Sequence, residues 1–294
     1  MSLLTLITVT YNLVEAGRID TLREAVESVQ SQSFTDVEHV IVDGASTDGT
    51  VGFLDELLLE QKSGPIPMRF ISEPDQSLYD AMNKGVALAK GEYVLFLNSD
   101  DYLTSKNSLA HLAQALHDGV DYAYGQQETL FLDGRKVLWK RMSPRNLLIR
   151  MPFGYGSLAF RRDKFVELGG HDLAFKICAD YDLVTRLLLA GARGVPVYSP
   201  ICTFREGGVS ADTAKTGNDH VGVWRKNLAP WLDLSGFSNA QMFAWLQTGR
   251  IPYSVCIRIA CNPAGPKILR KSAITALWIG TRKRLSGRFK PAQP

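Results

Sequence analysis

Cysteine is scarce in this 294-residue sequence, and no long apolar run is present. The four cysteines, Cys178, Cys202, Cys256 and Cys261, form no CxxC pair and no Cys/His cluster with the spacing of a zinc site. We therefore expect buried thiols in a reducing compartment. The apolar segment 273–280 is far shorter than the ~20 residues that a membrane-spanning helix needs.

The first residues lack the basic start and the small-residue cleavage site of a signal peptide. Leu3–Val9 instead has the composition of a buried strand. We therefore expect a cytoplasmic protein, with peripheral attachment to the inner face of the cell membrane left open.

Acidic residues are absent after Asp233, although ten Lys and Arg follow it. The preceding 233 residues hold 23 basic and 30 acidic side chains and are therefore net acidic. Such a division predicts an anionic partner for the tail, either nucleic acid or a bilayer surface.

Overall composition is that of a globular protein, with 45% hydrophobic and 21% charged residues and no internal repeat. In the first half, short apolar runs alternate with helical patterns, which indicates βαβ units and a mostly parallel sheet between helices. The expected strands are Leu3–Val9, His39–Val42, Met68–Ile71 and Tyr93–Leu97; the expected helices are Ile19–Gln30, Val51–Gln61, Leu78–Ala89 and Lys106–His117.

The pattern changes near Asp121. Short strands are expected at 122–125, 128–132, 135–140 and 157–160, and a helix at 180–190. We expect one domain over 1–215 that divides into two halves, 1–120 and 121–215. A helical, basic extension is expected over 216–294.

Polar residues follow each of the first four expected strands. Ligands of open α/β sheets bind beyond the carboxyl ends of the strands, so these segments predict one binding edge. They are Thr10-Tyr11-Asn12, Asp43–Thr50, Ser72–Asp75 and Asn98–Asp101.

The Asp100-Asp101 pair is suited to Mg²⁺ or Mn²⁺, which proteins hold through one or two carboxylates plus substrate phosphates. The alternative is that either aspartate caps the turn that follows. Asp43 is placed to contact a nucleobase or ribose. Asp48 is better explained as a cap at a helix start. Lys84 could reach a phosphate or lie on a solvated helix face.

Six motifs in order over residues 3–210 resemble family 2 glycosyltransferases, most closely the bacterial members that build exopolysaccharides of the colanic-acid type. The motifs are Thr10-Tyr11-Asn12, Val42–Thr50, Ser72–Asp75, Tyr79–Gly85, Phe96–Asp101 and Gly207-Gly208-Val209-Ser210. The resemblance implies a GT-A fold, a nucleotide-diphosphate sugar donor, a divalent metal and inversion at the anomeric carbon. It also implies that 1–215 is the catalytic domain, with a nucleotide-sugar half (1–120) and an acceptor half (121–215).

Carried over residue by residue, the resemblance implies that Asp43 contacts the base, usually uracil, and that Asp100 and Asp101 hold the metal. Asn98 stands where the family has its first metal-motif aspartate. The implied donor-binding residues are Thr10, Tyr11, Asn12, Asp43, Ser46, Asp75, Asp80, Lys84, Asn98, Ser99 and Asp100.

Asp180 occupies the place of the family's catalytic base. Inverting transfer needs a carboxylate to take the acceptor hydroxyl's proton. Asp182 lies on the other side of a helix, so one of the two is expected to face the cleft. The alternative for Asp180 is a helix N-cap. Tyr155 stands where close relatives have His, and His171 and His220 are nearby candidates to replace it.

We therefore expect an inverting, metal-dependent glycosyltransferase that moves a sugar from a UDP-sugar to a saccharide acceptor, lipid-linked, in exopolysaccharide or cell-surface glycan synthesis. The alternative is an inactive nucleotide-sugar-binding subunit. Nucleic acid is not expected, because basic and stacking residues do not interleave in the tail. For the basic tail, two alternatives remain: it binds an anionic membrane surface, or it packs on the domain.

Overall fold

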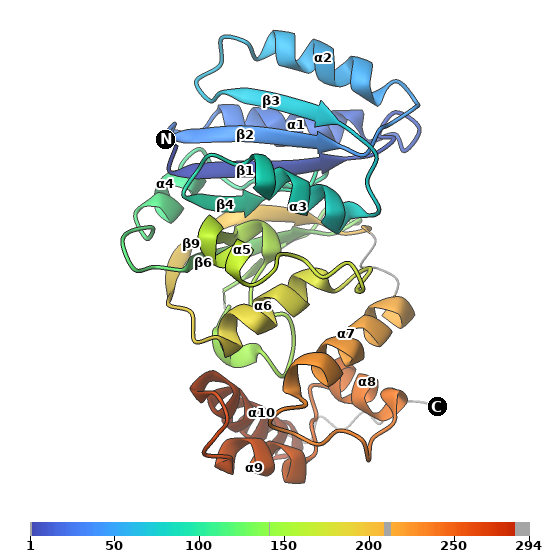
Figure 1. The fold of residues 1–294 in the computed structure, drawn as a ribbon, viewed down its shortest axis with the longest axis vertical. Helices are drawn as coiled ribbons and strands as arrows, with labels where there is room; N and C mark the ends of the chain where they lie inside the picture. The colour runs from blue at the N-terminus through green and yellow to red at the C-terminus, as the bar shows by residue number, and fades with distance from the viewer. Residues whose placement is uncertain (1, 141, 209–212, 286–294) are drawn as a thin grey trace. The chain divides into compact units, whose positions relative to one another are not determined.

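A computed structural model describes residues 2–140, 142–208 and 213–285 (Figure 1). The chain divides into two compact units. The first comprises Met1–Met142, Phe153–Ala179 and Ala192–Ala211; the second comprises Ser143–Pro152, Asp180–Gly191 and Asp212–Pro294.

The first unit is built on one sheet, in the strand order β3-β2-β1-β4-β8-β6-β9-β5, with β7 paired to β6. The strands are β1 (Leu4–Thr10), β2 (Val37–Asp43), β3 (Met68–Ser72), β4 (Tyr93–Phe96), β5 (Tyr102–Leu103), β6 (Tyr122–Leu130), β7 (Lys136–Trp139), β8 (Leu158–Arg161) and β9 (Gly194–Arg205). The helices are α1 (Ile19–Gln30), α2 (Thr50–Glu60), α3 (Leu78–Leu88), α4 (Ser108–Ala113), α5 (Arg162–Glu167) and the 3-10 helix η2 (Tyr155–Ser157).

The first four strands pair in parallel, as the alternation of strands and helices predicts. Leu6 belongs to a buried cluster with Ala25 and Val29 of α1. The next residue, Ile7, meets α3, where a Cβ added to Gly85 would lie 2.5 Å from it. Because successive strand residues point to opposite faces, α1 and α3 cover opposite faces of the sheet. That arrangement explains why β1 and β2 are buried along their whole length.

The second half of the sheet adds antiparallel pairs, β4 with β8 and β6 with β8. The two strands expected at 122–125 and 128–132 are one strand, β6, with a register shift between Tyr124 and Gln126. The twelve-residue strand β9 was not predicted, because Pro196 and Pro200 disfavour the strand assignment. It pairs in parallel with β6 and returns the chain to the edge where β4 ends.

The second unit is helical, as expected for the C-terminal region. Its elements are η1 (Pro144–Asn146), α6 (Ala179–Leu189), α7 (Thr213–Leu228), α8 (Asn239–Thr248), α9 (Tyr253–Cys261) and α10 (Lys267–Leu285). Its division from the first unit differs from the predicted boundary after residue 215, because α6 also belongs to it. The Tyr181 hydroxyl donates to the Leu147 carbonyl (2.5 Å) and accepts from Trp224 Nε1 (2.9 Å), so three separate segments share one core.

All four cysteines are free thiols, and Cys178, Cys202 and Cys256 are buried. The expectation of burial is wrong for Cys261, the last residue of α9, which is exposed. Within the described residues no helix is long and apolar enough to cross a membrane. Val209, Ser210, Arg288 and Lys290 of the sequence analysis lie outside the described residues.

His39 on β2 predicts a pH dependence of stability. Its side chain is fully buried, Nε2 lies 2.9 Å from Thr8 Oγ1, and burial lowers its pKa from 6.5 to about 4. The folded state therefore holds His39 neutral, whereas the unfolded chain takes up a proton below pH 6.5. The contribution of His39 to the free energy of unfolding is therefore complete above pH 6.5. It falls by about 3 kcal/mol as the pH is lowered toward 4.

Chemical denaturation between pH 4 and 7.5 measures this effect in the native protein and in H39Q. The variant should lose that part of the pH dependence, whereas H117Q, at an exposed histidine of the same unit, should keep it. Parallel pH curves for H39Q and the native protein would contradict the assignment.

Candidate functional site

The carboxyl ends of the four parallel strands lie together at one edge of the sheet. The Gly44 amide donates to the Thr10 carbonyl (2.9 Å), which joins the ends of β1 and β2. The Glu73 amide donates to the Asp43 carbonyl (3.0 Å), which joins β3, and the Leu97 amide donates to the Ile7 carbonyl (2.9 Å), which joins β4. The four polar segments are therefore neighbours, and ligands bind at this position in open α/β sheets.

Asp43 links three of these strand ends. Its side chain is fully buried, and its carboxylate accepts four hydrogen bonds. The donors are Thr10 Oγ1 (3.0 Å), the Ser46 amide (2.8 Å), Ser46 Oγ (2.5 Å) and Ser72 Oγ (2.7 Å). A buried carboxylate needs such partners. The structure thus assigns Asp43 an organising role, and contact with a base stays a prediction for it.

The loops after β1 and β2 are bonded to each other. The Asn12 amide donates to Ser46 Oγ (2.8 Å), and Asn12 Oδ1 accepts from the Thr47 amide (3.0 Å). Asn12 and Ala45 have positive φ angles of 46° and 59°. Asn tolerates this conformation but Ala does so at a cost, so the loops store backbone strain beside the strand ends.

Asp48 stabilises the same loops, although the N-cap of α2 is the next residue, Gly49. Its carboxylate accepts from the Thr50 amide (3.0 Å) and Thr50 Oγ1 (2.6 Å) at the start of α2. It also accepts from the Glu15 amide (2.7 Å) in the loop after β1. These bonds join the loop after β1 to the start of α2, so we interpret Asp48 as a structural residue.

Tyr11, Gly44 and Asp75 surround one small space. A Cβ added to Gly44 would lie 2.5 Å from Asp75 Oδ2 and 3.2 Å from Tyr11 Cδ2. The Tyr11 side chain is 64% exposed, so its ring is open to a ligand. Partial burial raises the pKa of Asp75, and the charge of Lys84 opposes that rise. An exposed ring beside a carboxylate suits a nucleobase, which can stack and donate a hydrogen bond.

Lys84 holds the loop between β3 and α3. Its ammonium group donates to the Pro74 carbonyl (2.5 Å) and pairs with Glu73 (3.1 Å) and Asp80 (3.8 Å). Asp80 in turn accepts from the Gln76 amide (3.0 Å). Both residues therefore shape the loop that carries Asp75, and direct contact with a phosphate remains a prediction.

The segment after β4 contains the predicted metal ligands. Asp101 is 2% exposed, and its carboxyl accepts from the Arg205 amide (2.9 Å) and Asn98 Nδ2 (3.2 Å). Burial, and next the charge of Asp100, raise the pKa of Asp101 to about 8. Asp100 is less buried, with 21% of its side chain exposed. Ser99 between them and the strand is buried.

These residues fit a divalent cation. Asn98 Oδ1 is buried and accepts no hydrogen bond from the part of the chain that the structure describes, which leaves an amide oxygen to be satisfied. The charge of Asp100 raises the pKa of Asp101, so a cation would relieve the repulsion between the two carboxylates. The described residues contain no cluster of three His, Cys, Asp or Glu that would bind a metal by itself. One or two carboxylates completed by substrate phosphates is the pattern of Mg²⁺ and Mn²⁺ sites.

Two arginines at this edge were not singled out from the sequence. Arg18 Nη1 lies 3.4 Å from Asp100 Oδ2, and its side chain is 43% exposed. Arg205, at the end of β9, donates from Nη1 to the Asp100 carbonyl (3.1 Å) and pairs with Glu24. Arg205 could not be recognised because β9 was not predicted. Arg18 lies outside the sequence motifs, so nothing in the sequence pointed to it.

Asp180 and Asp182 differ in their surroundings within the second unit. Asp182 is fully buried and contacts Arg186 (2.6 Å), Lys226 (2.9 Å) and Asn227 (2.8 Å). Such a carboxylate is committed to its ion pairs. Asp180 is only partly buried, in the first turn of α6, and accepts from the Tyr181 amide (2.7 Å). The base role is therefore still a prediction for Asp180.

Of the histidine candidates, His171 is buried and His220 is partly buried. His171 hydrogen-bonds to the Tyr155 hydroxyl, and the Asn83 side chain bonds both its amide (2.9 Å) and its carbonyl (3.0 Å). Tyr155 stacks on Phe96 with ring centroids 5.3 Å apart. Tyr155 and His171 thus belong to an aromatic cluster with Phe96 of β4. His220 packs on Tyr181 in the second unit (4.6 Å).

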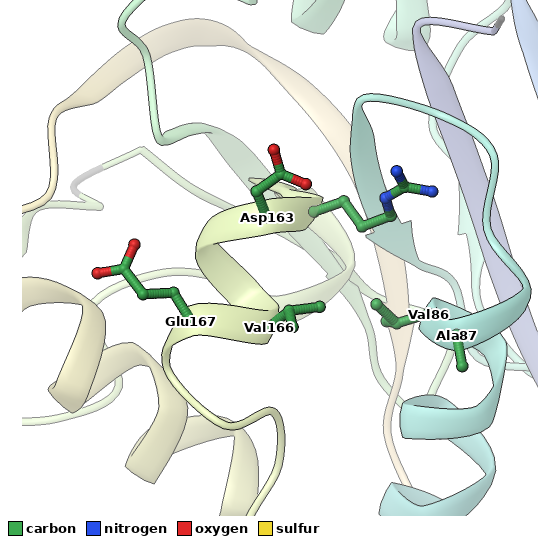
Figure 2. Close-up of a pocket in the computed structure, with 6 residues that line it drawn as sticks. Val86, Ala87, Asp163, Val166 and Glu167 are labelled. Carbon is green, nitrogen blue, oxygen red and sulfur yellow. The ribbon is translucent and has the colours of Figure 1, made fainter.

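A groove of about 510 Å³ lies between α3 and α5 (Figure 2). Its lining residues are Val86, Ala87, Arg162, Asp163, Val166 and Glu167. The Arg162 amide donates to the Glu92 carbonyl (2.8 Å) at the start of β4. The groove is therefore at the amino end of β4, opposite to the strand ends that carry Asp100, and we assign it no part in this site.

The model of glycosyl transferase family 2 matches residues 5–172. A PGL/p-HBAD biosynthesis glycosyltransferase of Mycobacterium bovis is 31% identical over 168 residues, which are 56% of this chain and 63% of that protein. An uncharacterised glycosyltransferase of Mycobacterium tuberculosis is 28% identical over 216 residues, 69% of this chain and 77% of that one. The chain thus spans less than two thirds of the first of these relatives.

Among solved structures, a mannosyltransferase of Pyrobaculum calidifontis in complex with GDP-Man and Mn²⁺ aligns with a TM-score of 0.61 at 18% identity. That alignment covers 98% of this chain and 76% of the other. Residues 1–349 of S. aureus TarS in complex with UDP-GlcNAc give a TM-score of 0.60 at 16% identity, covering 99% and 93%. Matching of the family model over more than half of the sequence, together with this sheet, shows that the chain belongs to glycosyl transferase family 2 and has the GT-A fold.

Proposed function

We propose that this chain is an inverting glycosyltransferase that moves a sugar from a UDP-sugar to a saccharide acceptor, in the presence of Mn²⁺ or Mg²⁺. The observation that carries the proposal is the convergence of four polar strand ends, three joined by the hydrogen bonds of Asp43 and the fourth by the Leu97–Ile7 backbone bond. Family membership and the structures solved with UDP-GlcNAc and with GDP-Man support it.

The donor would bind across the ends of the four parallel strands. Tyr11 offers an open ring to the base, and Asp75 beside it offers an acceptor for a base N–H. Arg18, whose guanidinium is partly exposed next to Asp100, is placed to pair with a phosphate oxygen. Thr10, Asn12, Ser46, Asp80 and Lys84 act by shaping these loops, as their hydrogen bonds within the protein indicate.

Asn98, Asp100 and Asp101 would hold the divalent cation. When bound, Mn²⁺ or Mg²⁺ neutralises negative charge on the departing diphosphate. Arg205 holds the segment in place through its backbone amide and guanidinium, which fix Asp101 and the Asp100 carbonyl.

Asp180 would act as the base. It takes the proton of the acceptor hydroxyl, the acceptor oxygen bonds to the anomeric carbon, and the bond to the diphosphate breaks with its electron pair leaving on the diphosphate. Attack on the face opposite the leaving group inverts the anomeric carbon. Asp182 is buried in its ion pairs, whereas Asp180 is only partly buried, which favours Asp180 as the base.

Relatives named for PGL/p-HBAD and O-antigen biosynthesis support a cell-surface glycan as the product. We propose a lipid-linked saccharide as the acceptor and exopolysaccharide or surface-glycan synthesis as the role.

Thermal-shift measurements with nucleoside diphosphates and their sugars, each with and without Mn²⁺, test the donor proposal. We expect the melting temperature to rise with UDP or a UDP-sugar only when metal is present, because ligands that bind the folded state stabilise it. No response to any nucleotide would contradict the proposal. Metal-dependent binding without sugar transfer would instead favour an inactive nucleotide-sugar-binding subunit.

A further inference from the structure

Helices α9 and α10 form a basic region in the second unit (Figure 1). They pack against each other, and the Tyr253 hydroxyl lies 3.1 Å from Thr281 Oγ1. The sequence after Asp233 contains ten basic residues and no acidic one. No carboxylate of these two helices can therefore neutralise their charge.

One side of α10 is buried and the other is exposed. The buried side consists of small and apolar residues, Leu269, Ala273 and Ala276, together with Ser272. Ser272 Oγ accepts from the Leu148 amide (2.9 Å), which fixes this side of the helix to the interior of the unit. The opposite side is therefore the one presented outward.

The exposed side combines cations with large apolar side chains. Ile274 is 57% exposed and Trp278 is 60% exposed, although both would normally be buried. Lys267, Lys271 and Arg282 are exposed as well. These five residues follow each other at spacings of three or four, which places them on one face of the helix. We call Lys267, Lys271, Ile274, Trp278 and Arg282 the α10 stripe.

The neighbouring helix repeats the combination. Ile257 is 51% exposed on α9, and Arg258 beside it is exposed too. Water disfavours such apolar exposure, whereas the boundary between lipid headgroups and acyl chains accepts apolar and cationic side chains together. Arg282 lies over the Trp278 ring, 5.3 Å from its centroid, so charge and ring occupy one spot, as they would at that boundary.

We propose that the α10 stripe binds the surface of a bilayer that contains anionic phospholipid. Lys267, Lys271 and Arg282 would pair with lipid phosphates while Ile274 and Trp278 enter the headgroup layer. The helix lies on the surface, because no described helix is apolar enough to cross it. Nucleic acid fits less well, since Trp278 is the single ring of the stripe and successive stacking platforms are absent from it. The proposal rests on the second unit alone and does not depend on the proposed sugar transfer.

Vesicle flotation with the full chain tests this proposal. We expect binding to vesicles of phosphatidylcholine with phosphatidylglycerol, weaker binding as salt is raised, and none to phosphatidylcholine alone. Tryptophan fluorescence should shift to the blue on binding. The shift should be much smaller in W278F, which keeps an apolar ring and still binds.

Two variants separate charge from apolar contact. K267E/K271E should lower the partition coefficient by roughly 30-fold or more, since each basic residue near an anionic leaflet contributes about fivefold. I274S/W278S should weaken binding at high salt, where the apolar contacts remain. The control K62E/K106E makes the same charge change at exposed lysines of the first unit and should bind as the native protein does.

Melting temperatures and metal-dependent nucleotide binding of all variants should match those of the native protein. A change in vesicle binding can then be told apart from a failure of the proposed glycosyltransferase function. Equal loss of vesicle binding in K62E/K106E would show a general charge effect and overturn the proposal. So would binding to duplex DNA at physiological salt that exceeds binding to anionic vesicles.

Discussion

Replacing Asp100 and Asp101 together by alanine should abolish metal-dependent donor binding. The variant removes both carboxylates that we assign to the cation and leaves Asn98 as the remaining ligand. We expect the affinity for UDP in the presence of Mn²⁺ to fall by more than ~100-fold, because a phosphate-completed Mg²⁺ or Mn²⁺ site depends on its one or two carboxylates. Calorimetry or thermal shift, with and without metal, measures the effect.

Stability must be separated from ligation in this experiment. Asp101 is buried and accepts from the Arg205 amide, so alanine also leaves that amide without its partner. D100N/D101N keeps hydrogen-bond acceptors at both positions and should lose metal-dependent binding while staying folded. D55A/E56A, an exposed acidic pair on α2, is the matched control and should bind normally. Unchanged affinity for UDP in the presence of Mn²⁺, in both D100N/D101N and the alanine variant, would contradict the metal assignment.

Asp180→Asn should remove turnover while leaving donor binding intact. The amide cannot accept the acceptor's proton, and loss of a general base costs about 10²- to 10⁴-fold in kcat. We expect the metal-dependent shift in melting temperature with UDP to match the native protein. Release of UDP from the donor, with and without a saccharide acceptor, measures the loss.

Two further variants give this test its specificity. D233N changes an exposed aspartate of the same unit and should be fully active. D182N should instead lower the melting temperature, because it weakens a buried ion network with Arg186 and Lys226. If D180N retained native kcat, Asp180 would be a helix-end residue only, and the base would have to be sought elsewhere.

The parallel half of the sheet was predictable from sequence because its signals are local. Strands β1 and β2 are buried on both faces and therefore read as continuous apolar runs. Helix α1 was predicted with both ends correct, since its apolar period is regular. The second half was less predictable. β9 contains two prolines, and its pairing with β6 joins residues 72 or more positions apart.

The site divides in a similar way. Motifs predicted which polar segments belong together, because each directly follows a strand. They did not reveal that the Asp43 carboxylate accepts hydrogen bonds from Thr10, Ser46 and Ser72. Nor did they reveal that Lys84 donates a hydrogen bond to the Pro74 carbonyl. Those roles depend on which donors the fold brings within reach. Asp182 became distinguishable from Asp180 in the same manner, through partners on α7.

The sequence by itself determined the family, the strand-helix alternation and the polar edge with Asp100 and Asp101, because these depend on residue type and spacing along the chain. Tertiary structure alone decided that β9 delivers Arg205 to that edge and that burial beside Asp100 raises the pKa of Asp101 to about 8. The physical reason is that burial and electrostatic repulsion depend on the surroundings of a group in space, and its neighbours in sequence do not specify them.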